Sequence, residues 1–296
     1  MSGQLKEVRN RIKSVTSTQQ ITKAMKMVSA AKLKRAQDRV VTARPFANKM
    51  IEVLGQLAKR TDEDFRHPLL DLRGDERYLL VLITADKGLC GAFNTNLTKA
   101  AQAFIKENSE KSIELVTIGR KGRDFFRNRH ATIASEYIGL TGKGRVDFSE
   151  ALDVARAIIK LYTETKEIDK VFLIYNEFKS VLSQRVMLEQ LLPVSRAENE
   201  EPESKSQQPV NLVDYIYEQP PAEIFAQLLP RLIETQIFRA LLESVASEQG
   251  ARMTAMDSAS KNASELIDSL TLNMNRIRQA AITNEIIEVV SGAAAL

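Results

Sequence analysis

The chain has 296 residues, of which 44% are hydrophobic and 6% aromatic, with a formal net charge of +4. No stretch approaches the roughly 20 apolar residues that cross a bilayer, which argues against a membrane-spanning helix. The single cysteine, Cys90, excludes an internal disulfide. The polar N-terminus resembles neither a signal nor a transit peptide and predicts a cytosolic protein.

Charge is distributed unevenly along the chain. The first 60 residues contain 14 Lys and Arg but only 3 Asp and Glu, a surplus of 11, so the remaining residues sum to −7. A basic arm on a mildly acidic body predicts an acidic partner for the arm. Charge alone leaves nucleic acid, a lipid surface and a protein open as that partner.

One long helix is predicted from Leu5 to about Lys59, where Pro45 is the only proline. Its narrow apolar stripe follows a spacing of three and four residues, and it resumes beyond the polar pair at Gln19. A helix several times the average length of about 11 residues suggests a coiled coil. The predicted stripe consists of Leu5, Val8, Ile12, Val15, Ile21, Met25 and Val28.

A second long helix is predicted from Arg231 to Val290, after the prolines at 220, 221 and 230. Its apolar and small residues alternate steps of four and three, which is a heptad seam. At 1.5 Å per residue, about 60 residues of helix span roughly 90 Å. Because the first helix is shorter, the tip of the second helix would have no partner within this chain. The seam consists of Met256, Ser260, Ala263, Ile267, Leu270, Met274, Ile277 and Ala281.

Between the two helices the pattern changes to short apolar runs alternating with helical stretches. The runs 77–84, 113–118 and 170–175 predict buried, parallel strands, and 183–192 predicts an edge strand. Helices are predicted over 95–107, 121–129 and 148–166. This alternation predicts a three-layer, Rossmann-like α/β domain.

The division expected from these patterns is an N-terminal coiled-coil helix over 1–60, a central α/β domain over 75–195, a mobile loop over 196–209 and a C-terminal coiled-coil helix over 210–296. The loop is inferred from its composition, which is polar and poor in apolar residues.

The best candidate for a chemical site is the turn from Thr84 to Gly91, which follows a buried strand and opens a helix. Its backbone amides could hold a phosphate with help from Lys87. Its spacing matches neither the dinucleotide fingerprint nor a P-loop, which favours a structural turn. The turn residues singled out are Asp86, Lys87, Gly88, Cys90 and Gly91.

Other chemistry is sparse. The two histidines, His67 and His130, lack partners at metal-ligand spacing, and Cys90 lacks a placed base. We therefore predict no catalytic residue, cofactor or metal. Two alternatives stay open: a basic coiled-coil protein that binds nucleic acid, and a small-molecule enzyme built on the α/β domain. Against nucleic acid, residues 1–45 contain no aromatic side chain for base stacking.

Three separate motifs resemble the gamma subunit of bacterial F-type ATP synthases, and together the resemblance covers nearly the whole chain. The first is RIKSVTSTQQITKAMKMV, beginning at Arg11, and the second is TADKGLCGAFN, beginning at Thr84. The third lies near the C-terminus and comprises ARMTAM from Ala251, NRIRQAAIT from Asn275 and EVVSGAAA from Glu288.

The resemblance implies a non-catalytic rotor subunit. In that family the terminal helices form an antiparallel, asymmetric coiled coil, the rod, inside a ring of three alpha and three beta subunits. The foot of the subunit sits with epsilon on the membrane c-ring. Proton-driven rotation drives ATP synthesis in the ring. The implied location is peripheral, at the cytoplasmic face of the bacterial inner membrane.

By the same resemblance, seven residues would contact loops of the alpha and beta subunits: Met25, Lys26, Arg252, Arg276, Arg278, Gln279 and Thr283. The tip from Ala281 to Leu296 would sit in an apolar sleeve of the ring. Gly250 interrupts the second long helix, at a cost of roughly 1 kcal/mol relative to Ala.

Overall fold

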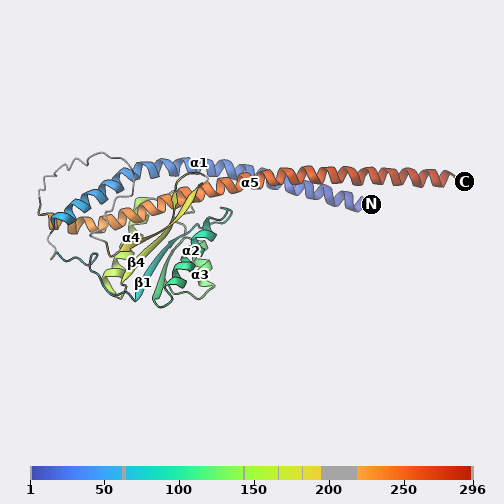
Figure 1. Ribbon diagram of the computed structural model, residues 1–296. Coiled ribbons are helices and arrows are strands. Elements are labelled where there is room, and N and C mark those ends of the chain that lie inside the picture. The colour runs from blue at the N-terminus through green and yellow to red at the C-terminus, as the bar shows by residue number, and fades with distance from the viewer. Residues whose placement is uncertain are drawn as a thin grey trace. The chain divides into compact units, whose positions relative to one another are not determined.

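A computed structural model describes residues 2–61, 65–142, 144–165, 167–181, 183–194 and 219–294. The loop predicted over 196–209 lies outside these residues. The chain divides into two compact units. The terminal helix pair comprises residues 1–31 and 252–296, and the central body comprises residues 32–251; each is described by itself (Figure 1). The predicted domain division along the sequence stays a prediction.

The central body is built on a five-stranded mixed sheet with the order β3-β2-β1-β4-β5. Four strands are parallel: β1 (Arg77–Ile83), β2 (Ser112–Ile118), β3 (Ile133–Tyr137) and β4 (Lys170–Phe178). The antiparallel strand β5 (Gln184–Leu192) lies at one edge, as predicted. Strand β3, at the other edge, was not predicted.

Three helices connect the parallel strands: α2 (Phe93–Glu107), α3 (Arg120–Arg127) and α4 (Phe148–Glu164). Helices α2 and α3 connect β1 to β2 and β2 to β3, toward one edge of the sheet. Helix α4 connects β3 back to β4, on the other side of β1. Because such crossovers are right-handed, α2 and α3 cover one face of the sheet and α4 covers the other. This arrangement confirms the three-layer α/β prediction.

Strand β1 lies at the centre of the core, with Leu79 to Ile83 fully buried. Leu80 and Leu82 pack in one apolar cluster with Leu97, Phe104 and Phe126 from the α2 and α3 side. Since side chains alternate along a strand, Leu79, Val81 and Ile83 face the opposite layer. The continuous apolar run in the sequence therefore reflects burial on both faces.

The long helices α1 (Ser2–Arg60) and α5 (Pro221–Ala294) each contribute to both units. Helix α5 begins ten residues before the predicted Arg231, so the prediction that Pro221 and Pro230 precede the helix was wrong, whereas Pro220 does precede it. Pro221 occupies the first helical position, where its missing N–H costs little, and Pro230 lies inside the helix. Among the described residues, no helix is both long and apolar enough to cross a membrane.

Within the terminal helix pair the two helices run antiparallel, with the N- and C-termini at the same end (Figure 1). Lys26 Nζ lies 2.6 Å from Asp257 Oδ1 across the pair. The predicted seam on α5 is confirmed: Met256, Ser260 and Ala263 are buried, and its remaining members are half-buried.

The predicted stripe on α1 is only partly correct. Its first four members are half-buried, but Ile21 and Val28 are 57% and 55% exposed. Thr22 and Ser29 are buried in their place, at 7% and 2% exposure. The heptad continues without a break through Gln19, so the seam contains these polar residues and the apolar ones point outward.

Candidate functional site: an outward apolar surface and a closed turn

The terminal helix pair presents large apolar side chains to solvent on both of its helices. On α1, Ile21, Met27 and Val28 are each more than half exposed. Near the end of α5, five large apolar residues are 49–72% exposed. Exposed apolar surface of this extent marks an interaction site. These five residues are Ile282, Ile286, Ile287, Val289 and Val290.

The exposed tip agrees with the prediction that α5 outlasts its partner. Lys26 lies opposite Asp257 in an antiparallel pair. Each residue toward the N-terminus of α1 is therefore level with the next residue toward the C-terminus of α5. Residue 2 of α1 therefore lies level with about residue 281 of α5, at equal rise per residue. Beyond that level the described part of α5 has no neighbouring helix within the pair. Its apolar residues are available to another molecule.

The seven predicted contact residues fall into two groups. Met25 and Lys26 are half-buried, and Arg252 is 9% exposed, so these three belong to the seam region of the pair. The other four are exposed, and the Thr283 hydroxyl donates to the Gln279 carbonyl at 3.0 Å. The exposed four are Arg276, Arg278, Gln279 and Thr283. Their contacts with the alpha and beta subunits stay a prediction.

Asp257 holds two lysines on the surface of the pair. Its carboxylate contacts Lys26 at 2.6 Å and Lys261 at 3.0 Å. Hydrogen bonds from Lys26 and then Lys261 lower the pKa of Asp257. The ammonium of Lys26 is therefore engaged within the pair, and a partner would meet Lys26, Asp257 and Lys261 together as a cluster with a net charge of +1.

The predicted turn lies at the carboxyl end of β1, in the central body. Asp86 at its start is 8% exposed. Its Oδ1 accepts hydrogen bonds from the backbone N–H groups of Arg120, at 3.1 Å, and Gly139, at 3.0 Å. Its Oδ2 accepts from the Gly142 N–H at 2.7 Å and from the Thr141 hydroxyl at 3.1 Å. One carboxylate thus joins the loops that follow three strands.

The ionised form of Asp86 is favoured by this arrangement. Burial raises the pKa of the carboxyl, but the hydrogen bonds from Gly139, Arg120, Gly142 and Thr141 outweigh it and leave the pKa below its usual value. The carboxylate occupies the N-terminus of α3, the position where a helix in such a sheet could bind a phosphate.

The turn also packs tightly against the residue that precedes α3, and its cysteine is buried. Gly119, at φ +98°, lies so close to Thr84 that any side chain there would overlap the Thr84 carbonyl. Cys90 is 1% exposed, and its Sγ accepts from Asn94 Nδ2 at 3.1 Å. An amide cannot serve as the base that a nucleophilic thiol needs. Lys87 and Gly91 are exposed and Gly88 is half-buried.

The geometry therefore favours the structural interpretation of the turn over a phosphate site. Across the described ranges, no group of three or more His, Cys, Asp or Glu could hold a metal ion. Sequence reasoning identified the turn but missed the role of Asp86. That role depends on the loop after β3, and no local signal in the sequence pairs the two.

Comparison with known proteins gives matches over nearly the full length. A family model described as ATP synthase matches residues 4–296. The ATP synthase gamma chain of Solibacter usitatus is 54% identical over 292 residues, 98% of each chain. That of Trichlorobacter lovleyi is 50% identical over 291 residues, covering 98% of this chain and 97% of the relative.

Solved structures with a similar fold come from mitochondrial ATP synthases. A chain from the Tetrahymena thermophila central stalk and c-ring structure is 27% identical, with a TM-score of 0.60, and the match covers 81% of this chain and 99% of that one. A chain from the Euglena gracilis OSCP/F1/c-ring structure is 20% identical, with a TM-score of 0.70 and coverage of 100% and 95%.

Proposed function

The chain belongs to the family of ATP synthase gamma chains, and from this premise we propose that it is the central rotating shaft of a bacterial F-type ATP synthase. It couples proton-driven rotation of the membrane c-ring to conformational change and ATP synthesis in a ring of three alpha and three beta subunits. The observation that carries the proposal is the full-length match to bacterial gamma chains. These relatives give no support to the nucleic-acid alternative.

The terminal helix pair suits this role physically. It is asymmetric, because α1 and α5 differ in sequence and α5 outlasts α1. Three equivalent beta subunits around such a pair each meet a different face. A ligand shifts a conformational equilibrium only through different contacts with the two states, and a rotating asymmetric surface supplies such differences in turn.

The subunit itself is non-catalytic in this proposal. Its α/β domain has the topology of nucleotide-binding domains, but its own Asp86 occupies the α3 N-terminus. The nucleotide sites are on the alpha and beta ring. The central body sits with epsilon on the c-ring, so the protein is peripheral at the cytoplasmic face of the inner membrane.

The contacts proposed with the ring divide by exposure. Arg276, Arg278, Gln279 and Thr283 are exposed and can meet polar or acidic loops directly. Met25, Lys26 and Arg252 act from the seam region, where a change would alter the pair and the contact together. The apolar tip beyond Ala281 fits an apolar sleeve.

The test is reconstitution with purified alpha and beta subunits, followed by native mass spectrometry and an ATPase assay. We expect one copy of this chain per three alpha and three beta subunits, and a change in ATP hydrolysis when it is present. A properly folded chain that forms no such complex would refute the proposal.

A double variant, Ile286→Ser with Val290→Ser, examines the tip. Both residues are more than half exposed, so the isolated chain should keep its helix content while assembly weakens. Glu285→Gln with Glu288→Gln is the matched control in the same turns, because it leaves the apolar surface unchanged. Loss of helix content in the serine variant would show that the tip stabilises the chain itself.

A further inference from the structure

A groove in the central body is not explained by the proposed ring contacts. It has a volume of about 590 Å³ and lies between α1, the start of α4 and α5. Three phenylalanines line it, one from each element: Phe46, Phe148 and Phe238. Phe148 and Phe238 stack edge to face, with ring centroids 5.2 Å apart.

The rim of the groove is apolar and open. Phe46 is 62% and Phe148 is 45% exposed, so two of the three rings reach the surface of the central body. A small ligand deep in the groove would leave these rings partly in water, whereas a protein segment would cover them.

The charges at the groove are unbalanced. Asp38 pairs with Lys34 at 3.2 Å, and Asp147 pairs with Arg145 at 2.8 Å, so both lining carboxylates are neutralised from outside. Two arginines also line the groove, Arg39 and Arg239. They are the source of its surplus positive charge.

Arg39 has no carboxylate partner among the described residues, and Arg239 shares Glu243 with Arg44. Arg39 donates to the Val146 carbonyl at 3.2 Å. Arg239 Nε lies 3.7 Å from Glu243 Oε1 and makes no hydrogen bond with it. Glu243 already accepts hydrogen bonds from Arg44, at 3.1 and 3.2 Å, and from the Phe178 N–H, at 2.9 Å. An occupant carrying a carboxylate would complete the charge balance.

We propose that this groove receives a segment of another subunit of the assembly, in which a large apolar side chain lies next to an Asp or Glu. The apolar side chain fills the space between the phenylalanines, and the carboxylate pairs with Arg39 or Arg239. The inference rests on the proposed function, because that function supplies the partner subunits. It adds a docking surface in the central body, apart from the terminal helix pair.

The test is site-specific photocrosslinking in the purified ATP synthase complex. p-Benzoylphenylalanine replaces Thr42, which lines the groove and is exposed. A matched control places it at Asn48, exposed on the same helix, absent from the lining and roughly 120° around at 3.6 residues per turn. We expect a Thr42 crosslink to one subunit, at a peptide with a large apolar residue beside Asp or Glu, and no such crosslink from Asn48.

The arginines give a second readout. Arg239→Gln combined with Arg39→Gln should lower the Thr42 crosslink yield about fivefold, as expected for losing a partly exposed charge pair. Lysine at both positions should restore most of the yield, because it keeps the charge. An unchanged yield in the glutamine variant would refute the predicted carboxylate.

The remaining outcomes separate the two proposals. A Thr42 crosslink only to lipid or to a basic peptide, or no crosslink in an intact complex, would overturn the groove inference while the rotor function stands. If the wild-type chain forms no complex with the other subunits, the proposed function fails, and with it the source of the occupant.

Discussion

The central sheet and the terminal helix pair bury very different side chains. In β1, every residue from Leu79 to Ile83 is at 0% exposure. In the helix pair, the most buried positions on α1 are Ser29 and Thr22, whereas the apolar Val28 beside them is 55% exposed. Large aliphatic side chains contribute roughly 1.5–3 kcal/mol each when fully buried, and hydroxyl residues contribute far less.

This difference indicates which region supplies stability and which supplies contacts with other molecules. The central body has a core of its own. In the pair, small or polar residues such as Thr22, Ser29 and Ser260 are among the most buried, the larger seam residues are mostly half-buried, and Ile21 and Val28 lie outside, unlike in a self-contained coiled coil. Such a pair is completed by other molecules. Substitutions in each region test this difference in stability.

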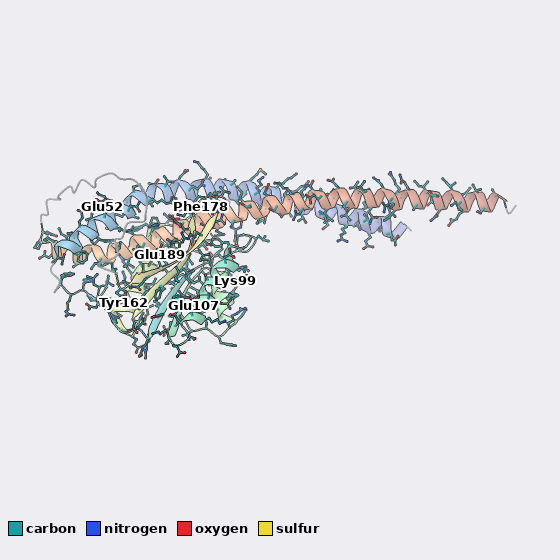
Figure 2. The ribbon with its side chains drawn as sticks, viewed as in Figure 1. Glu52, Lys99, Glu107, Tyr162, Phe178 and Glu189 are labelled. Carbon is teal, nitrogen blue, oxygen red and sulfur yellow. The ribbon has the colours of Figure 1, made fainter. Side chains whose placement is uncertain are left out.

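The largest loss should follow Glu243→Ala in the central body. Glu243 is fully buried and accepts from Arg44 and from the backbone N–H of Phe178, the strand end labelled in Figure 2. The variant leaves the buried Phe178 N–H without its acceptor and removes the ion pair with Arg44, whose side chain is 42% exposed, which together should cost about 3–4 kcal/mol. Urea unfolding followed by circular dichroism measures it. Glu52→Ala, at an exposed pair with Lys49, is the control and should cost about 0–1 kcal/mol.

Leu82→Ala compared with Ile267→Ala tests the contrast directly. Leu82 is fully buried in β1, so its truncation should destabilise the chain by about 3 kcal/mol. Ile267 is a half-buried seam residue, and its truncation should cost about 1 kcal/mol. Equal losses in the free energy of unfolding would show that the pair is as firmly packed as the sheet.

The sequence predicted those elements whose signal is local. The apolar runs located β1, β2 and β4, because a strand buried on both faces is apolar throughout. Strand β3, with the sequence IASEY, lies at an edge and carries two exposed residues, so no run marks it. The seam on α1 was misplaced because Ile21 and Val28 were assigned to the interior on hydrophobicity alone. An uninterrupted count of heptads from Leu5 would have selected Thr22 and Ser29.

Long-range features could not be predicted in this way. The role of Asp86 requires the loops after β2 and β3 to meet at one end of the sheet, which is a consequence of strand order. The groove needs three elements that are far apart in sequence. Both depend on tertiary contacts, whereas periodicity reports only the neighbours of a residue along its own helix or strand.

Asp86 should make the central body sensitive to acid. A carboxyl whose pKa is lowered by folding adds stability above its unfolded pKa, and that stability is lost as the pH falls through the folded value. The urea midpoint should therefore decrease below about pH 4. Asp86→Asn should cost about 1–3 kcal/mol at pH 7, since the amide cannot accept all four hydrogen bonds. The variant should lose part of the acid dependence; an unchanged pH profile would contradict this role for Asp86.

Gly250→Ala should stabilise α5 by up to about 1 kcal/mol, because Ala favours the helix interior over Gly. A Cβ at this position would lie 3.5 Å from the Val181 carbonyl oxygen and 3.6 Å from Phe178, which is ordinary contact. Thermal unfolding should show a higher midpoint. Gly122→Ala in α3 is the opposite case, since its Cβ would lie 2.8 Å from Thr84 Oγ1 and should lower the midpoint.

The smallest effect is expected for Ile21→Ser, which tests the position of the seam. Since Ile21 is 57% exposed, the isolated chain should change by no more than about 0.5 kcal/mol. Ile12→Ser, at a half-buried seam position earlier on α1, should cost more, about 1 kcal/mol. Urea unfolding of both variants compares them. A larger loss at Ile21 would place it back in the seam, whereas a silent substitution that still weakens assembly with alpha and beta subunits would identify the outward face of α1 as contact surface.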